Sequence, residues 1–152
     1  MTAEQDLVER IQRIEDYISI TELKARYLRA VDSRDWDLLE SVFLADATFV
    51  SLTGVTSQGT AGWLERAKGA LEGSWSVHHA HMPEISIEGD TATGIWALED
   101  YVGFASGKTV HGYGHYQETY QRTPDGWRIS RYAISRLREE WTETVVRPAF
   151  GT

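Results

Sequence analysis

Residues 77–108 read VHHAHMPEISIEGDTATGIWALEDYVGFASGK, and this stretch decides the fold because it contains two long strand patterns with a turn between them. Two further strand patterns follow it directly, so the expected strands span 77–88, 91–105, 109–122 and 127–138. The dipeptides that separate them, Gly-Asp, Ser-Gly and Asp-Gly, favour tight turns at residues 89–90, 106–107 and 125–126. Strands joined by such short turns pair antiparallel, which predicts one sheet of long hairpins.

The chain before this sheet is predicted to begin with a long helix. Between residues 7 and 31 apolar side chains recur close to the 3.6-residue period, at Leu7, Ile11, Ile14, Ile18, Leu23, Tyr27, Leu28 and Val31. Charged residues lie between them, as on the solvent side of an amphipathic helix. The pattern leaves open whether this helix is broken at residues 19–21.

Shorter elements connect the long helix to the strands. Three of them are expected in turn, namely a helix at 36–44, a strand at 47–52 and, after a turn region at 54–59, a helix at 60–71. The N-cap of the helix at 36–44 can come from Asp32, Ser33 or Asp35, whose side-chain oxygens accept hydrogen bonds from free backbone N–H groups. This second helix is expected to pack beneath the first.

Helices followed by a run of antiparallel strands define an α+β domain in which helices cover one face of a curved sheet. At 152 residues the chain is expected to form a single domain, residues 1–152. A strongly curved sheet closed by helices encloses a cone with an apolar interior that can hold a small ligand. Six Trp, seven Tyr and four Phe can line such a chamber, although most are expected to be core residues.

Composition excludes several classes of function. The chain has no Cys, which excludes disulfides, thiolate metal sites and cysteine nucleophiles. A net charge of −8 disfavours binding to nucleic acid and to anionic membranes, so a neutral or apolar small molecule is the expected partner. No stretch reaches the roughly 18 apolar residues of a membrane span, and the start MTAEQDLVER lacks the pattern of a signal peptide. A cytoplasmic protein is therefore expected.

Two short pieces of the sequence carry candidate chemistry, the pair Tyr27 and Asp32 near the end of the first helix and the doublet His78 and His79 in a strand. A carboxylate and an imidazole together can move a proton at neutral pH. Tyr27 and Asp32 lie about 140° apart around a continuing helix, so the helix must end or turn at Asp32 for both to point inward. The residues alone leave a simpler interpretation open, in which Asp32 is a cap and His78 is structural.

The histidines also raise the question of a metal site. Adjacent residues of a strand face opposite sides, so only one of His78 and His79 can enter the chamber. His79 and His81 share a side and could form a metal-binding pair. No third ligand is evident in the sequence, so no metal site is predicted.

A carboxylate is also expected to face inward from the next strand, where Glu99 and Asp100 are neighbours. A buried carboxylate must be paired or neutralised. Pairing of Asp100 with His78 is the functional interpretation, and a salt bridge to Arg136 or Arg138 is the structural one. Both remain open.

The strand at 109–122 carries two more histidines. His111, Tyr113 and His115 share one side of it and Tyr116 the other, and the sequence does not decide which side lines the chamber. No phosphate-binding loop, nucleophile elbow or RNA-binding signature is present.

Three segments together carry a family resemblance: RIEDYISITELKARYLRAVDSRDWDLLESVFLADATF at 13–49, HHAHMPEISIEGDTATG at 78–94 and YQETYQRTPDGWRIS at 116–130. They resemble SnoaL-like proteins of the NTF2-like superfamily, whose fold is a cone-shaped α+β barrel. Within that superfamily the residue pattern is most similar to scytalone dehydratase, bile acid 7α-dehydratase and hexachlorocyclohexane dehydrochlorinase. The resemblance departs from the scytalone enzyme at residues 47–52, which lack its second Tyr.

These enzymes carry out β-eliminations with an Asp and a His, and the resemblance implies that no metal or organic cofactor is needed. It places Asp32 and His78 at the catalytic pair, favours His78 over His79, and adds Tyr27 and Asp100 as catalytic residues. Further residues are implied in substrate binding: His115, Arg138, Trp96 and Tyr116.

The implied function is a dehydratase-type lyase acting on a hydrophobic oxygenated small molecule such as a polyketide, a steroid or an aromatic metabolite. In this scheme His78, oriented by Asp32, removes a proton, and Tyr27 or Asp100 assists the departure of hydroxide as water. A polyketide cyclase, a ketosteroid-type isomerase and a noncatalytic binding protein remain alternatives. The resemblance also implies a homodimer formed through the outer face of the sheet, to which Trp127 and Tyr132 could contribute.

Overall fold

Strand β4 (Thr91–Gly103) shows why the sheet forms where the sequence predicts it. Along most of its length its residues alternate between exposed and buried, so one side faces the core and the other faces away. The computed structural model describes residues 2–143, and the same alternation continues in β5 (Lys108–Thr123). The expected α+β architecture, with helices over a curved and mainly antiparallel sheet, is confirmed.

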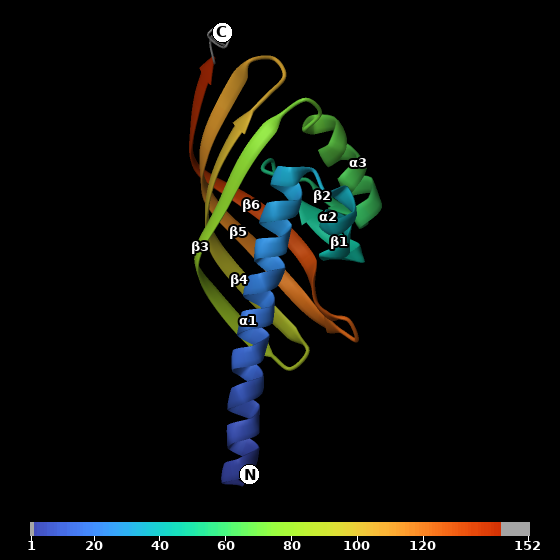
Figure 1. Ribbon diagram of the computed structural model, residues 1–152, viewed down its shortest axis with the longest axis vertical. Helices are drawn as coiled ribbons and strands as arrows, with labels where there is room; N and C mark the ends of the chain where they lie inside the picture. Colours follow the sequence, from blue (N-terminus) through green and yellow to red (C-terminus); the bar gives the residue numbers. More distant parts are fainter. Residues whose placement is uncertain (1, 144–152) are drawn as a thin grey trace, which may run out of the picture.

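The sheet has six strands in the order β2-β1-β6-β5-β4-β3 (Figure 1). The remaining strands are β1 (Phe43–Val50), β2 (Thr56–Gln58), β3 (Trp75–Glu88) and β6 (Gly126–Glu143). Consecutive strands from β3 to β6 pair antiparallel, as the turn sequences predict. Strand β1 pairs parallel with β6 and antiparallel with β2, so part of the expected turn region forms a short strand.

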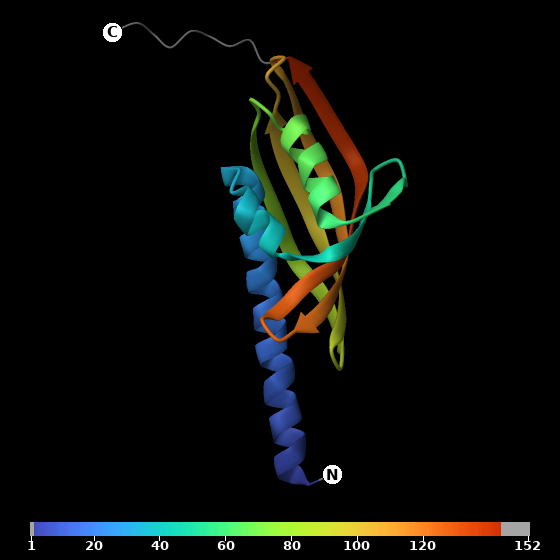
Figure 2. The ribbon, with the colours of Figure 1, turned by 90° about the vertical axis from the view of Figure 1, so that its right-hand side faces the viewer.

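Helix α1 (Ala3–Ser33) is continuous through residues 19–21. It begins with a capping box between Thr2 and Gln5 and ends where Arg34 adopts a left-handed backbone conformation. Its second half lies across one face of the sheet, whereas its first half extends beyond the sheet (Figure 1, Figure 2). The apolar residues of that extension are therefore exposed, namely Leu7, Val8, Ile11, Ile14 and Ile18. No helix in the described part of the chain combines the length and the apolar character that a membrane crossing requires.

Two shorter helices complete the covered face. Helix α2 (Trp36–Ser41) is capped by Asp35, whose side chain accepts the N–H of Leu38 at 3.1 Å. It ends earlier than the expected helix at 36–44, because β1 begins at Phe43. Helix α3 (Thr60–Ala70) forms where the third helix was expected and packs against β1 and β2.

The core lies between these helices and the concave face of the sheet. Its centre is aromatic and includes Tyr27, Phe43, Phe49, Trp96, Tyr116 and Tyr132. Trp127 and Tyr132 would face opposite sides in a regular strand, but the pairing of β6 with β5 shifts between them. Both are consequently buried in the core, and the expectation that they contribute to a contact on the outer face is wrong.

Candidate active site

Asp32 lies in the last turn of α1 and contacts β3 instead of capping α2. Its Oδ2 accepts the backbone N–H of His78 at 2.8 Å, and its Oδ1 lies 2.7 Å from His78 Nδ1. The hydroxyl of Ser76 donates to Oδ1 at 2.9 Å. Because Asp35 supplies the cap of α2, Asp32 is free to hold the imidazole of His78 in one orientation.

Arg34 extends this network from the end of α1 into β3. Its guanidinium donates to the Ser76 hydroxyl and to the Ser74 hydroxyl, each at 2.8 Å. These bonds position Ser76, which in turn donates to Asp32. Sequence reasoning missed Arg34, Ser74 and Ser76, because a polar or charged side chain at the end of a helix or beside a strand carries no pattern that distinguishes it from a surface residue.

The electrostatics of the pair Asp32 and His78 favour one arrangement of protons. Burial alone would raise the pKa of Asp32, but the hydrogen bonds from His78 and Ser76 outweigh that effect, and the pKa is lowered. Asp32 is therefore a carboxylate at neutral pH and accepts the proton of His78 Nδ1. In this tautomer the lone pair of His78 Nε2 is free to accept a proton.

Asp100 lies on the opposite side of the imidazole. His78 and Asp100 are Cα partners in the pairing of β3 with β4, and both side chains are on the concave face. The distance from His78 Nε2 to Asp100 Oδ2 is 3.8 Å, and Arg136 Nη2 donates to the same oxygen at 2.6 Å. Only 11% of the His78 side chain and 2% of the Asp100 side chain are exposed. Asp100 therefore lies close to His78, as the functional interpretation expects, and forms a salt bridge to Arg136, as the structural interpretation expects.

Gly112 gives Arg136 the space to reach Asp100. It is the Cα partner of Asp100 on β5, and a Cβ added there would collide with Arg136 Nη1 and with Asp100 Oδ1. The guanidinium of Arg136 therefore passes over Gly112 to reach the carboxylate of Asp100. Only a residue without a side chain is compatible with this crossing.

The expectation that Arg138 contacts a substrate in the chamber is wrong. Arg136 pairs with Gly114 and Arg138 with Tyr113, so the register of β6 skips one residue between them. This irregularity turns Arg138 to the outer side, where its side chain is 71% exposed and lies 2.9 Å from Glu140. Arg136 takes the inward position instead.

Several buried polar atoms near His78 have no hydrogen-bond partner within residues 2–143. Among them are Asp100 Oδ1, Arg136 Nη1 and the hydroxyl of Tyr116. Burial raises the pKa of Tyr116 well above its usual value, and the charges of Asp100 and Arg136 also influence it. Since buried polar atoms are normally paired, these atoms are suited to bind a polar group of a ligand.

Tyr27 reaches β6 rather than His78. Its hydroxyl forms a 2.6 Å hydrogen bond with the hydroxyl of Tyr132, and burial raises its pKa above the usual value. Tyr27 faces β6 while Asp32 faces β3, so both contact the sheet although the helix continues to Ser33. The expectation that the helix ends or turns at Asp32 holds to within one residue, because α1 ends at Ser33.

A second buried ion pair, which sequence reasoning missed, lies deeper on the concave face. Lys24 Nζ donates to Glu118 Oε1 at 2.6 Å and lies 3.2 Å from the centre of the Tyr116 ring. Burial lowers the pKa of Lys24 to about 8, and the charge and hydrogen bond of Glu118 oppose this effect. A lysine in an amphipathic helix is normally exposed, so the sequence does not indicate that Lys24 is buried and paired with Glu118.

The remaining residues expected at the substrate site are divided between the two faces of the sheet. Trp96 and Tyr116 are buried on the concave face, and the indole N–H of Trp96 donates to the Tyr120 hydroxyl at 2.8 Å. His115 precedes Tyr116 in β5 and so lies on the outer face, where His111 also lies. The expectation that His115 contacts a substrate in the chamber is therefore wrong.

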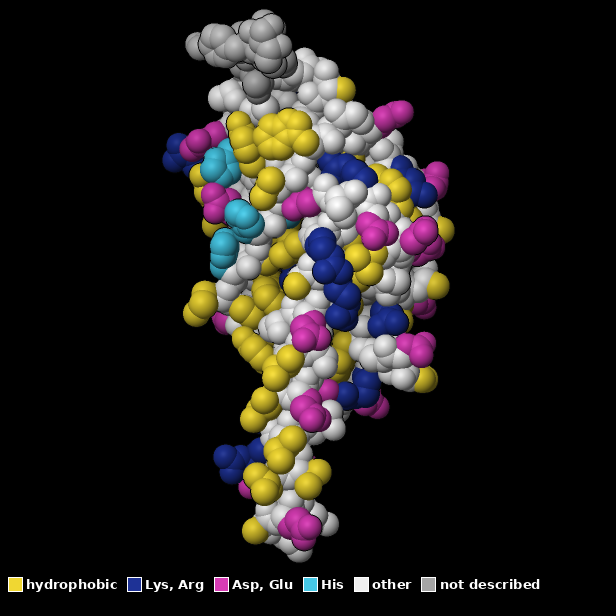
Figure 3. Space-filling view, viewed as in Figure 1, with side chains coloured by type: hydrophobic (Ala, Val, Ile, Leu, Met, Phe, Trp, Pro, Cys, Tyr) yellow, Lys and Arg dark blue, Asp and Glu magenta, His cyan; other side chains and the backbone are white. Residues whose placement is uncertain are grey.

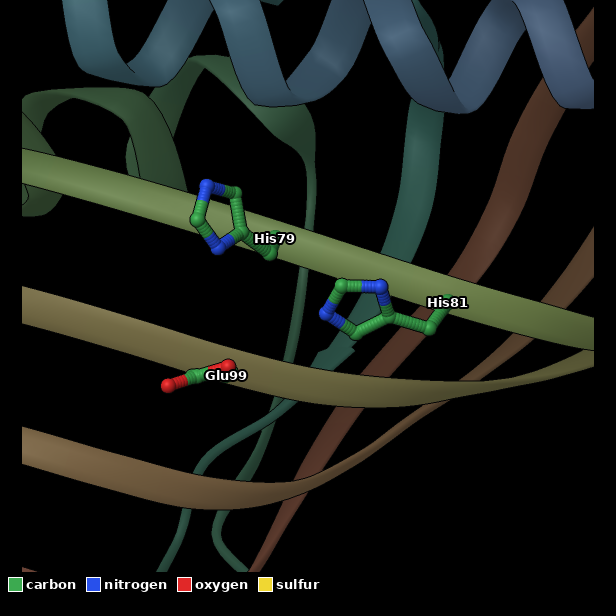
Figure 4. A group of neighbouring side chains, drawn as sticks. All are labelled: His79, His81 and Glu99. Carbon is green, nitrogen blue, oxygen red and sulfur yellow. The ribbon is translucent and has the colours of Figure 1, made fainter.

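His79 points away from the concave face and joins a group on the outer face (Figure 4). The possible ligand atoms of His79, His81 and Glu99 all lie within 4.8 Å of one another. The sequence shows no third ligand beside His79 and His81, but the structure places Glu99 next to them. Glu99, on the neighbouring strand, adds a carboxylate that could serve as a third ligand.

A cavity of about 660 Å³ opens beside α3, β1 and β6. Mostly apolar side chains line it, including Phe49, Leu52, Trp63, Tyr132 and Ile134. His78 and Asp100 are not part of this lining. Ile134 and Arg136 are alternate residues of one strand, so this end of the cavity is about 7 Å along β6 from Arg136.

Comparison with known proteins places the chain in a family context. Residues 12–133 match the profile of the SnoaL-like domain. The "Probable cyclase FGR4" of Gibberella zeae is 29% identical over 129 residues, which cover 75% of this chain and 86% of that protein.

Two solved structures illustrate the shared fold. An NTF2-like protein with a cystatin-like fold from Novosphingobium aromaticivorans gives a TM-score of 0.76 at 26% identity, covering 90% of this chain and 92% of its own. The hexachlorocyclohexane dehydrochlorinase LinA-type3 of Novosphingobium barchaimii gives a TM-score of 0.79 at 19% identity, covering 91% and 99%. The second likeness concerns the fold alone.

Proposed function

This chain belongs to the SnoaL-like domain family, and we propose that it is a cofactor-independent lyase of the dehydratase type. The family and fold support conversion or binding of a small molecule. One observation carries the finer proposal: His78 is held by Asp32 at 2.7 Å and presents its other nitrogen toward Asp100 and Arg136. This geometry suits general acid–base elimination.

His78 acts as the base in the proposed reaction. Asp32 accepts the Nδ1 proton, so Nε2 can remove a proton from the carbon next to a carbonyl group of the substrate. The imidazolium that forms lies between Asp32 and Asp100, and both carboxylates stabilise its charge. Asp32 is therefore a positioning residue that also stabilises the protonated base.

The leaving group receives help from Arg136 and from the protonated His78. Arg136 Nη1 has no partner within the described residues and can donate to the oxygen on which negative charge develops. The C–O bond breaks, a C=C bond forms, and the proton on Nε2 passes to the departing hydroxide, which leaves as water. Tyr27 donates to or accepts from Tyr132 and its pKa is raised, so we assign it no proton transfer.

The proposed substrate is a hydrophobic oxygenated molecule of the polyketide, steroid or aromatic class. Its apolar part would occupy the cavity lined by Phe49, Trp63 and Ile134. Its oxygenated end would extend along β6 to Arg136, about 7 Å beyond Ile134. The mostly apolar lining of the cavity, with the charged groups of Asp100 and Arg136 outside it, supports this class of substrate over a highly charged one.

Cyclisation is the second candidate reaction, because a relative that is 29% identical is named a probable cyclase. A cyclase or an isomerase can use the same His78 base to form an enolate and then make a bond or move a proton without eliminating water. Product mass separates isomerisation from elimination, since only elimination loses one water.

The test begins with the wild-type chain and a panel of β-hydroxy carbonyl compounds from the three classes, with products analysed by mass spectrometry. For a compound that is converted, Asp32→Asn and His78→Ala are expected to lower turnover by roughly 10²- to 10⁴-fold. Circular dichroism and ligand affinity should stay near wild type in both variants, because the two residues act on the chemical step.

His115→Ala is the matched control, since it removes an imidazole from the outer face of the same sheet. Its turnover should equal that of the wild type. Wild-type turnover in Asp32→Asn or His78→Ala would overturn the assigned roles. Binding of panel compounds without any conversion would instead support a noncatalytic binding protein.

A further inference from the structure

The outer face of β3 and β4 carries a group of histidines and a glutamate that the proposed reaction does not use. His79 and His81 project from β3 and Glu99 from β4, with their side chains turned toward one another (Figure 4). In the space-filling view histidine side chains gather at this edge of the molecule (Figure 3). Both histidines are exposed and Glu99 is half-buried, so the group is open to ions from solvent.

The register of the sheet creates this group. His79 and His81 are two residues apart in β3 and share a side, while Glu99 is the Cα partner of His79. The three possible ligand atoms therefore come from adjacent positions of two hydrogen-bonded strands, within 4.8 Å of one another. Ligand atoms around tetrahedral zinc lie about 3.3 Å apart. Small rotations of the exposed side chains are therefore enough to bring the three ligand atoms, now within 4.8 Å of one another, to this separation.

A fourth residue orients the glutamate. His111 Nε2 lies 2.8 Å from Glu99 Oε1, and His111 Nδ1 lies 3.3 Å from the hydroxyl of Tyr113. One neutral tautomer satisfies both contacts, with Nε2 donating to Glu99 and Nδ1 accepting from Tyr113. Such a bond holds the carboxylate in place and leaves Oε2 for a cation, as hydrogen bonds to metal-binding carboxylates generally do.

We propose that His79, His81 and Glu99 bind a divalent transition-metal ion, with Zn²⁺ as the preferred occupant, and that His111 positions Glu99. Two imidazoles and one carboxylate are ligands typical of zinc, and water can complete a tetrahedron on the exposed side. Hard cations such as Mg²⁺ prefer all-oxygen sites, so they should bind poorly here. The site is on the face opposite to His78 and does not depend on the proposed reaction.

Metal binding has a structural consequence at the edge of the sheet. Strand β3 is an edge strand, and its pairing with β4 is interrupted between His81 and Glu84, where Met82 has a positive φ of 38°. A metal held by His79, His81 and Glu99 links β3 to β4 next to this interruption. Because the ion binds the folded chain, it should raise the melting temperature.

Isothermal titration of the tag-free, metal-free chain with Zn²⁺ tests the proposal, and a melting curve with and without Zn²⁺ supplies a second readout. We expect one Zn²⁺ per chain with a micromolar or tighter Kd. His79→Ala, His81→Ala and Glu99→Gln should each weaken Zn²⁺ binding by about 100-fold or more, and His111→Phe by about tenfold. The increase in Tm with Zn²⁺ should disappear in the double variant His79→Ala, His81→Ala.

His115→Ala is the control, because it removes an outer-face imidazole that is not in the group. It should bind Zn²⁺ as the wild type does. Unchanged affinity in the double variant, equal loss in His115→Ala, or tighter binding of Mg²⁺ than of Zn²⁺ would overturn the proposal. Because His79 and His81 are exposed, their replacement should leave the fold intact, and the circular dichroism spectrum of each metal-free variant checks this directly.

Discussion

The concave face of the sheet contains two ion pairs of equal length and different character, one buried and one partly buried. Lys24–Glu118 and Asp100–Arg136 each join their charged atoms at 2.6 Å. In the first pair, Glu118 Oε1 accepts from Lys24 and Oε2 accepts from Tyr120, and almost nothing is exposed. In the second, Asp100 Oδ1 and Arg136 Nη1 have no partner within residues 2–143.

This difference separates a structural pair from a binding pair. Leaving a buried polar atom unpaired is destabilising, so a group whose only role is structural tends to be fully satisfied. Glu118 meets that condition, with both oxygens bonded and an aromatic ring beneath its partner Lys24. Asp100 and Arg136 do not, and they adjoin an imidazole that Asp32 has already oriented. We infer that the unpaired atoms of Asp100 and Arg136 bind a polar group of a ligand.

The largest expected effect comes from breaking the satisfied pair. Lys24→Met leaves the Glu118 carboxylate buried without a counter-charge, and the free energy of unfolding should fall by about 3–5 kcal/mol. Urea denaturation followed by circular dichroism measures this change. If the pair is purely structural, turnover per folded molecule should change little.

The double variant Lys24→Met, Glu118→Gln is the control for this experiment. It removes both charges and keeps an oxygen to accept the Tyr120 hydroxyl, so most of the lost stability should return. Stability as low in the double variant as in Lys24→Met would mean that the charge imbalance is not the cause. The contrast between the two ion pairs would then need another explanation.

A smaller loss of stability and a larger loss of activity are expected when the Asp100–Arg136 pair is broken. Arg136→Gln removes the guanidinium from Asp100, but Arg136 is 19% exposed and part of Asp100 is already unpaired. Stability should fall by about 1–3 kcal/mol, whereas turnover should fall by roughly 10²- to 10³-fold. Denaturation and steady-state kinetics on one preparation measure both quantities.

Arg138→Gln is the matched variant, because Arg138 is two residues away on the same strand and faces outward. Its stability and turnover should both stay near wild type. Equal turnover in Arg136→Gln and wild type would show that the unpaired atoms of this pair do not serve a ligand.

How far the sequence predicts this arrangement depends on whether a feature is local. The hairpins are predicted correctly because turn dipeptides and alternating residues are local signals. The inward position of His78 follows from strand alternation together with the family resemblance. The predicted inward position of Arg138 and the predicted outer-face positions of Trp127 and Tyr132 are wrong. Irregular pairing in β6 reverses side-chain direction, and the residue pattern gives no sign of it.

The sequence also does not predict features that depend on the register between distant segments. Glu99 becomes a third ligand only because it is the partner of His79 across two strands. Lys24 is buried because Glu118, far away in sequence, pairs with it between α1 and the sheet. A single sequence does not specify such pairings, whereas it does specify the period of each element.

The smallest expected effect concerns the hydrogen-bonded tyrosine pair Tyr27 and Tyr132. Tyr27→Phe removes a 2.6 Å hydrogen bond to Tyr132 but keeps the ring that packs against Phe43 and Tyr116. We expect a loss of about 1 kcal/mol in the free energy of unfolding and less than about a threefold change in turnover. Tyr132→Phe should have the same effect, and the double variant should lose little more than either single one, because both changes remove one shared bond. A turnover loss of tenfold or more in Tyr27→Phe alone would place its hydroxyl in contact with the substrate and restore the catalytic role that the resemblance implies.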